Sequence, residues 1–531
     1  MSSKKKNLIT LLVLCAVLAV CLILYFLMPS KSGKKDSDPD KDKKQITVDT
    51  ITADTIQRMT FEKNGKEIWA LSHEKDHWKF SDGASIPVNE EKVTAITDAL
   101  NPLKAVEKIE DGVQQLDQYG LKNPSMTLIV TAKDGREYKY DIGRKVPKEN
   151  MGYYSKSNAG DTIYCLDETL VTSINVAKNK MIKMDKLPQI EADYMTYICV
   201  DNKKGKDFEA KYVSDKDKVD FYSNWNITKP YKKPLATSAS EWNNTLGYFN
   251  ALTYTELVDY QCEDLSAYGL AQPSSVITVR YYKAKKGYTP TATATPSTVV
   301  TGQSSGKTSY IIPENKREYK TLILCVGDKT KDGYYVCEKG SRHVYKMDQS
   351  VVENMTKLDA YKSMDHCVYS VLATSIRGYD VTYGNTTLKV TRTPAKTKDK
   401  KTAAATPSPT EGQQGIAVQN KSDKSQKNIW TLNGKRISDK DENAFLTPYS
   451  TAYLLEYSEK AVDHEVKVKS TKPVLTIVYH EDKRDVTIKY LPYDGTNFYR
   501  VDKNGMDYFL VDKLLVDDII TKFKGIEKLA K

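Results

Sequence analysis

A pattern that occurs three times along the chain constrains its fold more than any other feature of the sequence. Residues 153–171, 334–352 and 498–516 align without gaps, and each segment opens with an aromatic pair. A third aromatic residue and an Asp follow at the same two offsets in every copy. Repetition at roughly 150 to 200 residues indicates tandem domains, so one fold is expected three times. No catalytic or ligand-binding motif recurs with the repeat, which favours a protein that offers binding surfaces to a partner. The third aromatics are Tyr164, Tyr345 and Phe509, and the acids are Asp167, Asp348 and Asp512.

Strand signals dominate each repeat. The chain has 36 Tyr against 10 Phe, and runs such as SMTLIVTA and PVLTIVYH are rich in β-branched and aromatic residues. Each repeat is expected to begin with strands that carry a Trp (Trp78, Trp225 or Trp430). An amphipathic helix should follow, at 89–100 with Asn89 as N-cap, at 240–251, and from about 439. The predicted class is α+β: three tandem repeats, each with an antiparallel sheet and two short helices, after one N-terminal transmembrane helix.

Local signals predict several details of this fold. Gly120 and Gly269, in two YGLxxP turns, are expected to adopt a positive φ, and the third repeat lacks this turn. Pro448 is expected to kink or end the first part of the third helix. The Asp of each repeated motif is expected to cap a closing helix. Alternation along a strand predicts one core and one exposed residue in each aromatic pair. An exposed Tyr could stack on sugars, but strand packing is the favoured interpretation.

The N-terminus carries an apolar run. Lys4, Lys5 and Lys6 precede residues 8–28, which are long enough to span a bilayer as a helix. A cleavable signal peptide is the alternative, but the run is long for one and no small-x-small site follows. We expect an uncleaved anchor (8–28), a cytoplasmic tail (1–7) and a charged flexible stalk (29–44). Lysines lie on both sides of the run, yet a long following domain is exported largely regardless of charge, so the body is placed outside the cytoplasm.

The remaining chain is divided into three repeats at 45–185, 186–362 and 363–531. Two stretches rich in Thr, Ser, Pro and Gly, near 284–313 and 394–425, explain the unequal spacing and are expected to be disordered insertions. The net charge of +11 includes +5 from residues 1–44, since nine Lys face four Asp there. The remaining charge of +6 is spread over 487 residues, whereas a nucleic-acid-binding protein concentrates its basic residues on one face.

Signatures of enzyme chemistry are weak. Residues 302–308 resemble a phosphate-binding loop but are one residue short between the glycines and lack a flanking strand and helix. His73 and His77 match HExxH, yet their segment is predicted to be a hairpin and not a helix. His366 and Cys367 are interpreted as a core or surface pair. We assign no catalytic, cofactor-binding or metal-ligating residue and expect no cofactor.

Six cysteines lie outside the apolar run, and their spacing shows no disulfide framework, so free thiols are expected. Two of them sit in strand-like runs and should be small buried hydrophobes. The six are Cys165, Cys199, Cys262, Cys325, Cys337 and Cys367, and the two in strand-like runs are Cys165 and Cys325.

The first two repeats share the Trp strand, the YGLxxP turn and the paired tyrosines. These residues are Trp78, Tyr119, Gly120, Leu121, Pro124, Ile142, Gly143, Tyr153, Tyr154 and Tyr164 in repeat 1, and Trp225, Tyr268, Gly269, Leu270, Pro273, Gly327, Tyr334, Tyr335 and Tyr345 in repeat 2. On these residues the first two repeats resemble the domain-of-unknown-function (DUF) 4340 family of bacterial membrane-anchored proteins, and the third repeat is similar only weakly. Members of the family often accompany gliding-motility-type ABC transporters, and the resemblance implies an accessory role outside the cytoplasm. The resemblance implies no catalytic residues.

The function expected from the sequence is that of a non-enzymatic, single-pass membrane protein that serves as accessory or scaffold to an ABC-transporter-like complex. Its partners would be the membrane, through the N-terminal helix, and transporter subunits. The alternative is a surface protein that binds cell-wall polymer or glycan through Tyr-rich faces. A zinc-dependent hydrolase is the remote alternative.

Overall fold

The computed structural model describes residues 45–110, 115–220, 222–290, 312–393, 428–463 and 471–529. The predicted tail, membrane anchor and stalk (1–44) lie outside these residues, as do 291–311 and 394–427, which make up most of the two predicted insertions. Within the described part, no helix combines the length and apolar character needed to cross a bilayer. The described residues divide into two compact units, and the division lies between Lys183 and Met184.

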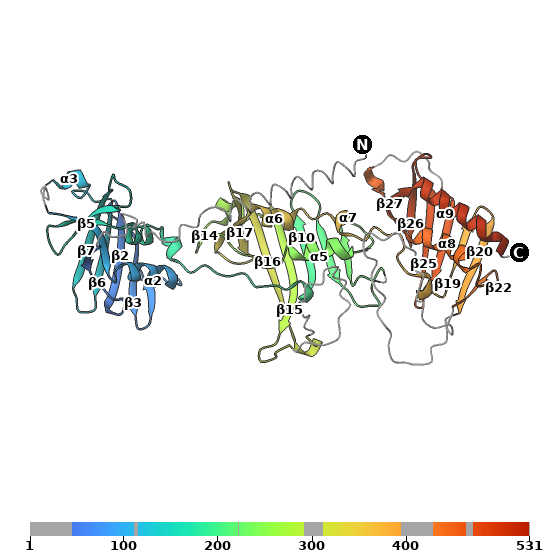
Figure 1. Ribbon diagram of the computed structural model, residues 1–531, viewed down its shortest axis with the longest axis horizontal. Helices are drawn as coiled ribbons and strands as arrows, with labels where there is room; N and C mark the ends of the chain where they lie inside the picture. Colours follow the sequence, from blue (N-terminus) through green and yellow to red (C-terminus); the bar gives the residue numbers. More distant parts are fainter. Residues whose placement is uncertain are drawn as a thin grey trace, which may run out of the picture. The chain divides into compact units, whose positions relative to one another are not determined.

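In the first unit, the described residues form one antiparallel sheet of nine strands in the order β1-β5-β9-β8-β7-β6-β2-β3-β4 (Figure 1). Helices α2 (Glu90–Ala99), α3 (Leu116–Tyr119) and α4 (Glu168–Ile174) accompany it, and α2 packs against α4. The strands are β1 Ile46–Asp49, β2 Ile56–Lys63, β3 Lys66–Glu74, β4 His77–Phe80, β5 Leu103–Ile109, β6 Met126–Ala132, β7 Glu137–Lys145, β8 Tyr153–Ser157 and β9 Ile163–Leu166.

The second unit contains two further sheets, which we call sheet 2 and sheet 3. The described strands of sheet 2 are ordered β13-β12-β11-β10-β15-β16-β17-β18-β14. Its helices are α5 (Ala239–Gly247), α6 (Gln349–Thr356) and α7 (Ala360–Ser363). The strands are β10 Met195–Asn202, β11 Phe208–Tyr212, β12 Trp225–Lys229, β13 Leu235–Ala236, β14 Glu256–Asp259, β15 Ser275–Ala284, β16 Arg317–Lys329, β17 Gly333–Glu338 and β18 Val344–Asp348.

Sheet 3 repeats this order as β22-β21-β20-β19-β24-β25-β26-β27-β23 in the described residues. Helices α8 (Glu442–Tyr453) and α9 (Lys513–Ile526) pack against each other. The three antiparallel sheets confirm the strand-rich α+β prediction, including the repeat whose sequence is most divergent. The strands are β19 Gly378–Tyr383, β20 Thr386–Thr393, β21 Ile429–Leu432, β22 Lys435–Arg436, β23 Glu459–Lys460, β24 Leu475–His480, β25 Asp485–Pro492, β26 Phe498–Lys503 and β27 Met506–Asp512.

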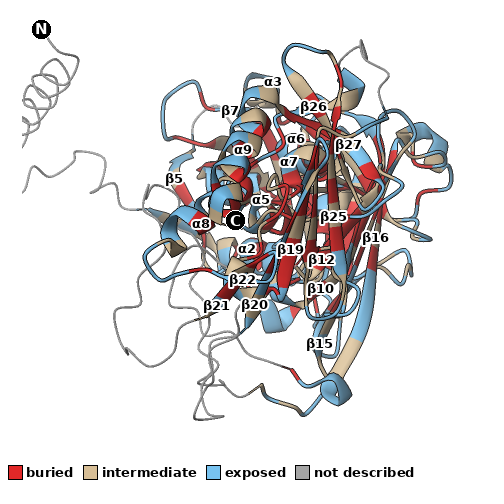
Figure 2. Cartoon of the chain, turned by 90° about the vertical axis from the view of Figure 1, so that its right-hand side faces the viewer, coloured by how far each residue is buried: buried red, intermediate tan, exposed pale blue. Residues whose placement is uncertain are grey.

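The core beside each sheet is built from every second residue of its strands, because successive side chains of a strand point to opposite faces. Side chains of alternate residues face the helices and are buried, and Figure 2 shows the buried residues gathered along the strands. In sheet 3 the core is rich in tyrosine: Tyr379, Tyr449 and Tyr479 are all buried, and the hydroxyl of Tyr449 donates to the carbonyl oxygen of Val371 at 2.7 Å. These tyrosine rings therefore pack the core of sheet 3 as large hydrophobic side chains, and the buried hydroxyl of Tyr379 has no hydrogen-bond partner among the described residues.

Helix caps form where the sequence predicts them. The side chain of Asn89 accepts from the backbone N–H of Lys92 at the start of α2. The repeated Asp caps the closing helix of all three repeats: Asp167, Asp348 and Asp512 accept backbone N–H groups at 2.9, 2.8 and 2.7 Å. Each carboxylate satisfies donors that the first helical turn leaves unpaired. In contrast, α8 continues through Pro448, so the expectation that this proline could end the helix is wrong.

The YGL turns dock onto the sheet. Gly120 and Gly269 have φ values of 70° and 69°, as predicted. A Cβ atom on Gly143 would collide with the carbonyl oxygen of Tyr119, so the turn needs a glycine on the strand below it. The ring of Tyr119 also meets that of Tyr154 edge to face, with centroids 5.0 Å apart.

The prediction of one core and one exposed residue in each aromatic pair is wrong for repeats 1 and 2. Both tyrosines of each pair are half-buried, because the turn covers the second one instead of leaving it exposed. In repeat 3, which lacks the turn, the register position of Gly143 holds Leu491, and this leucine is buried. The loss of the turn and the gain of a large strand residue thus occur together.

Candidate functional site

One face of sheet 2 carries polar and aromatic side chains, and we call it the open face. Ile198, Val200, Ile277 and Val279 point to the other face and are 1 % exposed or less. Residues one position along each strand, such as Tyr197, therefore point to the open face. The consecutive residues Thr228 and Lys229 both belong to this face because the register between β11 and β12 shifts there. The described members of the open face come from β10, β11, β12, β15 and β16: Tyr197, Asp201, Glu209, Lys211, Thr228, Lys229, Thr278, Arg280, Tyr282, Arg317, Tyr319 and Thr321.

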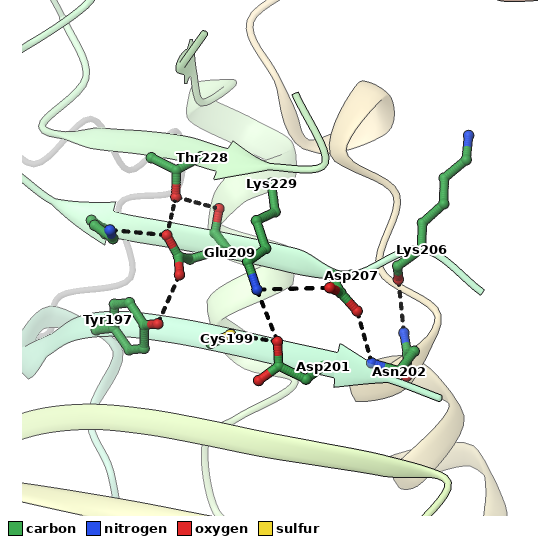
Figure 3. Close-up of polar contacts among 10 residues, drawn as sticks. Tyr197, Cys199, Asp201, Asn202, Lys206, Asp207, Glu209, Thr228 and Lys229 are labelled. Atoms are coloured by element: carbon green, nitrogen blue, oxygen red, sulfur yellow. Dashed lines mark hydrogen bonds and ion pairs between the residues drawn. The ribbon is translucent and has the colours of Figure 1, made fainter. Parts of the chain in front are cut away.

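Glu209 is the centre of the first polar group on this face (Figure 3). Its carboxylate accepts from the hydroxyls of Thr228 at 2.5 Å and Tyr197 at 2.9 Å, and it pairs with the Nζ of Lys211 at 2.9 Å. Burial alone would raise its pKa, but these three donors outweigh burial and hold the pKa of Glu209 at about 2. A carboxylate that stays ionised at all ordinary pH values fixes three strands together and is unsuited to general acid catalysis.

A second group lies further along the same strands. The Nζ of Lys229 is 2.9 Å from Asp201 and 3.7 Å from Asp207, and Asp207 in turn accepts from the backbone N–H of Asn202 at 3.0 Å (Figure 3). Cys199 donates to Asp201 at 3.5 Å. All of these charges have partners within the sheet, so the surface is a fixed pattern of paired charges.

Aromatic rings and guanidinium groups continue the open face along the β15–β16 hairpin. Arg280 lies over the ring of Tyr197, 4.5 Å from its centroid, and Arg317 lies over Tyr282 at 4.3 Å. Tyr319 faces Tyr282 across the strands, with centroids 5.9 Å apart, and it is 56 % exposed. Stacked cations of this kind hold the rings in place at the surface.

A hollow of about 620 Å³ lies beside this hairpin. Tyr194, Tyr281 and Tyr282 line it together with Lys283 and Ile312. The ring centroids of Tyr194 and Tyr282 are 5.2 Å apart, so these two rings pack against each other in the wall of the hollow. Aromatic walls with a nearby cation suit stacking on a ring-shaped ligand such as a sugar.

The edge of sheet 2 holds the most enzyme-like arrangement of the described residues. Asp185 accepts from the hydroxyl of Tyr345 at 2.5 Å and lies 2.9 Å from the Nδ1 of His343. Tyr260 stacks on the ring of His343 at 4.0 Å. Burial opposes ionisation of Asp185, but the hydrogen bonds from Tyr345 and His343 lower its pKa overall. Tyr345 is only 2 % exposed, so its hydroxyl is not available as a nucleophile, and the group ties the segment around Asp185 to β18.

The histidines singled out in the sequence are not gathered into a site. His73 and His77 lie on β3 and β4 of a hairpin, as predicted, and His73 stacks on Trp78 at 4.7 Å. The Nε2 of His366 lies 2.9 Å from the carbonyl oxygen of Tyr361, and burial raises the pKa of the neighbouring Cys367 to about 12. Among the described residues, no three His, Cys, Asp or Glu side chains are placed to hold a metal ion. The phosphate-loop-like residues 302–308 lie outside the described part.

Sequence reasoning missed the open face. Nothing in the linear order shows that Glu209 meets Thr228 and Tyr197. The available signal was the alternation in SVITVRYY, which places Arg280 and Tyr282 on one face of a strand.

Comparison with known protein families identifies the family of this chain. The model of the family described as "Domain of unknown function (DUF4340)" matches residues 78–273 and 225–423, which together cover more than half of the chain and most of repeats 1 and 2. No curated protein and no solved structure gives a significant match.

Proposed function

This chain belongs to the DUF4340 family, and on that premise we propose that it is a non-enzymatic scaffold of an ABC-transporter-like membrane complex. In this proposal residues 8–28 anchor the chain in the membrane as a single span, and the three repeats lie outside the cytoplasm. The family resemblance described above supports a transporter as the partner, and the fold offers a candidate docking surface.

The open face of sheet 2 is the observation that carries the proposal. It is a sheet surface with fixed, paired charges, and Arg280, Tyr282, Arg317 and Tyr319 extend it with Tyr and Arg side chains. Tyr and Arg are the residues most enriched at protein interfaces, and pre-paired charges lose little entropy when a partner covers them. Such a face suits a docking partner of complementary charge.

A photo-crosslinking amino acid at Thr321 tests this proposal. Thr321 is exposed on the open face, whereas Asn354 is exposed on α6, which packs on the opposite face, so Asn354 serves as the matched control site. Full-length protein is crosslinked in its native cells, extracted in detergent and analysed by mass spectrometry. Transporter subunits joined at Thr321 and not at Asn354 support the scaffold. Equal crosslinking at both sites, or no membrane protein at either, rejects it.

Cell-wall or glycan binding is the second candidate, favoured by the hollow that Tyr194, Tyr281 and Tyr282 line. It predicts that the full-length protein is retained on purified cell wall and that Tyr282→Ala releases it. Leu514→Ala is the control, because Leu514 is 74 % exposed but lies on α9 in another repeat. Retention that survives Tyr282→Ala excludes this hollow as the binding site.

A further inference from the structure

Two cysteines face each other across neighbouring strands of sheet 2. Cys325 of β16 is the direct register partner of Cys337 of β17. Two residues away on both strands, the backbone N–H of Lys339 donates to the carbonyl oxygen of Ile323 at 2.9 Å. Hydrogen-bonded pairs alternate along an antiparallel ladder, so the cysteine pair also occupies a hydrogen-bonded position, where Cα atoms are about 5.5 Å apart. That separation is within the range that a disulfide spans.

The pair lies in a small apolar cluster that opens into a hollow. Cys325 and Cys337 are 9 % and 3 % exposed and pack with Leu270 and Val344 beneath the second YGL turn. A hollow of about 360 Å³ reaches both cysteines, and Lys339 and Arg342 line it as well. The hollow therefore gives a small molecule a path to the sulfurs.

The surroundings make the two thiols unequal. A hydrogen bond from Cys337 to the sulfur of Cys325, aided by the positive charge of Lys339, lowers the pKa of Cys325 to about 7 against the opposing effect of burial. The same hydrogen bond, together with burial, raises the pKa of Cys337. One thiol is thus ready to react as thiolate near neutral pH while the other keeps its proton, as in dithiols that undergo exchange.

The fold does not require sulfur at these positions. In repeat 1 the strand pair β7–β8 corresponds to β16–β17 of repeat 2. Asp141 lies two residues before Gly143, as Cys325 lies two residues before Gly327, and its partner across the strands is Lys156. Two charged residues occupy the equivalent register position there, and they form ion pairs with Lys139 and Asp161 and not with each other. The cysteines are therefore a separate feature of repeat 2.

We propose that Cys325 and Cys337 form a reversible dithiol–disulfide couple that exchanges with small-molecule disulfides entering the hollow. The Cys325 thiolate attacks one sulfur of the disulfide, whose S–S bond breaks, and the first small thiolate leaves with the electron pair and takes up a proton. Cys337 then loses its proton and attacks the Cys325 sulfur, and the second small thiolate leaves. Two protein thiols are oxidised to one disulfide, and one small disulfide is reduced to two thiols.

The geometry also predicts how stable the disulfide is. Facing residues of a ladder have Cβ atoms about 4.5–5.5 Å apart, whereas a disulfide needs about 3.5–4.5 Å, so the strands must move closer. A bond formed under such strain is reduced easily, and exchange should therefore run in both directions.

Oxidised glutathione added to the reduced full-length protein in detergent tests the proposal. Peptide mapping without reductant should show a Cys325–Cys337 link that dithiothreitol reverses, and this experiment needs no variant. Cys337→Ser, whose hydroxyl can still donate to the Cys325 sulfur, should retain one glutathionyl group on Cys325, whereas Cys325→Ala should leave Cys337 unmodified near pH 7. A link from Cys262 to either cysteine, or no link at all, overturns the proposal.

Two controls separate the pair from ordinary buried thiols. Cys262→Ala alters the same apolar cluster and should leave the Cys325–Cys337 link intact. Burial raises the pKa of Cys165 in repeat 1 to about 11, so Cys325 should be alkylated near pH 7 at least about tenfold faster than Cys165. Equal alkylation rates contradict the proposal, and melting curves of each variant show whether it is folded.

Discussion

The carbonyl oxygen of Tyr268 lies against the α-carbon of Gly327, in the space that a side chain at that position would occupy. The same relationship holds between Tyr119 and Gly143 in repeat 1. Each YGL turn is therefore seated on a strand glycine, and the second tyrosine of the aromatic pair packs against the turn. In repeat 2 the rings of Tyr268 and Tyr335 meet edge to face, with centroids 5.0 Å apart.

Gly327→Ala should displace this turn. The added methyl group would collide with backbone and with the side chain of Leu270, so we expect a loss of about 1–3 kcal/mol in the free energy of unfolding and faster hydrogen exchange at Gly269 and Leu270. Gly247→Ala, on α5 of the same repeat, has no heavy atom within 4 Å and should not destabilise the protein. Unchanged exchange in Gly327→Ala would show that the turn is not held by this contact.

Asp512→Ala should weaken the start of α9. The carboxylate of Asp512 accepts from the backbone N–H of Leu514 at 2.7 Å, and loss of an N-cap costs about 1 kcal/mol. Asp512→Asn keeps an acceptor oxygen and should retain most of the stability. Urea unfolding of the three proteins, followed by helix circular dichroism, measures the difference. Equal midpoints for the Ala and Asn variants would contradict the capping role.

Glu209→Gln should make the free energy of unfolding depend less on pH in the acid range. The folded-state pKa of about 2 is below the ordinary value of 4.5, so the unfolded chain binds this proton first. Ionised Glu209 therefore stabilises the fold fully above about pH 4.5, and this contribution is lost as the pH falls towards about 2. With solvent screening it amounts to roughly 1 to 2 kcal/mol.

Melting temperatures of wild type and Glu209→Gln between pH 7 and pH 3 check this prediction. The two curves should converge as the pH falls. Glu263→Gln, which changes an exposed carboxylate of the same repeat, is the control and should run parallel to wild type. Parallel curves for Glu209→Gln would mean that its hydrogen bonds add no stability.

Arg484→Ala should loosen a segment of repeat 2 from repeat 3. The guanidinium of Arg484 donates to the carbonyl oxygens of Lys218 at 2.7 Å and Val219 at 3.3 Å, and it also pairs with Glu481 at 2.8 Å. Removing the donors leaves two carbonyl groups without these partners, a loss of about 1–3 kcal/mol. Hydrogen exchange should accelerate around residues 218–224. Arg436→Ala, at an exposed position on β22, should leave it unchanged.

Local features of the fold were predictable because their causes are local. A helix cap needs only an Asp before a helical run, and a left-handed turn needs only a glycine, so Asp167, Asp348, Asp512, Gly120 and Gly269 could be assigned from neighbouring letters. The prediction for the aromatic pairs failed because it treated the strand as if no other segment covered it. The covering turn comes from a part of the chain more than 30 residues earlier.

The sequence by itself determined that one α+β fold is used three times, because the gapless motif preserves a strand pair and a helix-capping Asp in all three repeats. Tertiary structure alone decided which side chains meet. The ladder of sheet 2 brings Cys325 opposite Cys337 and places Glu209 among Thr228, Tyr197 and Lys211. Strand register sets these encounters, and a shift of one residue would turn each side chain to the other face, so spacing along the chain does not reveal them.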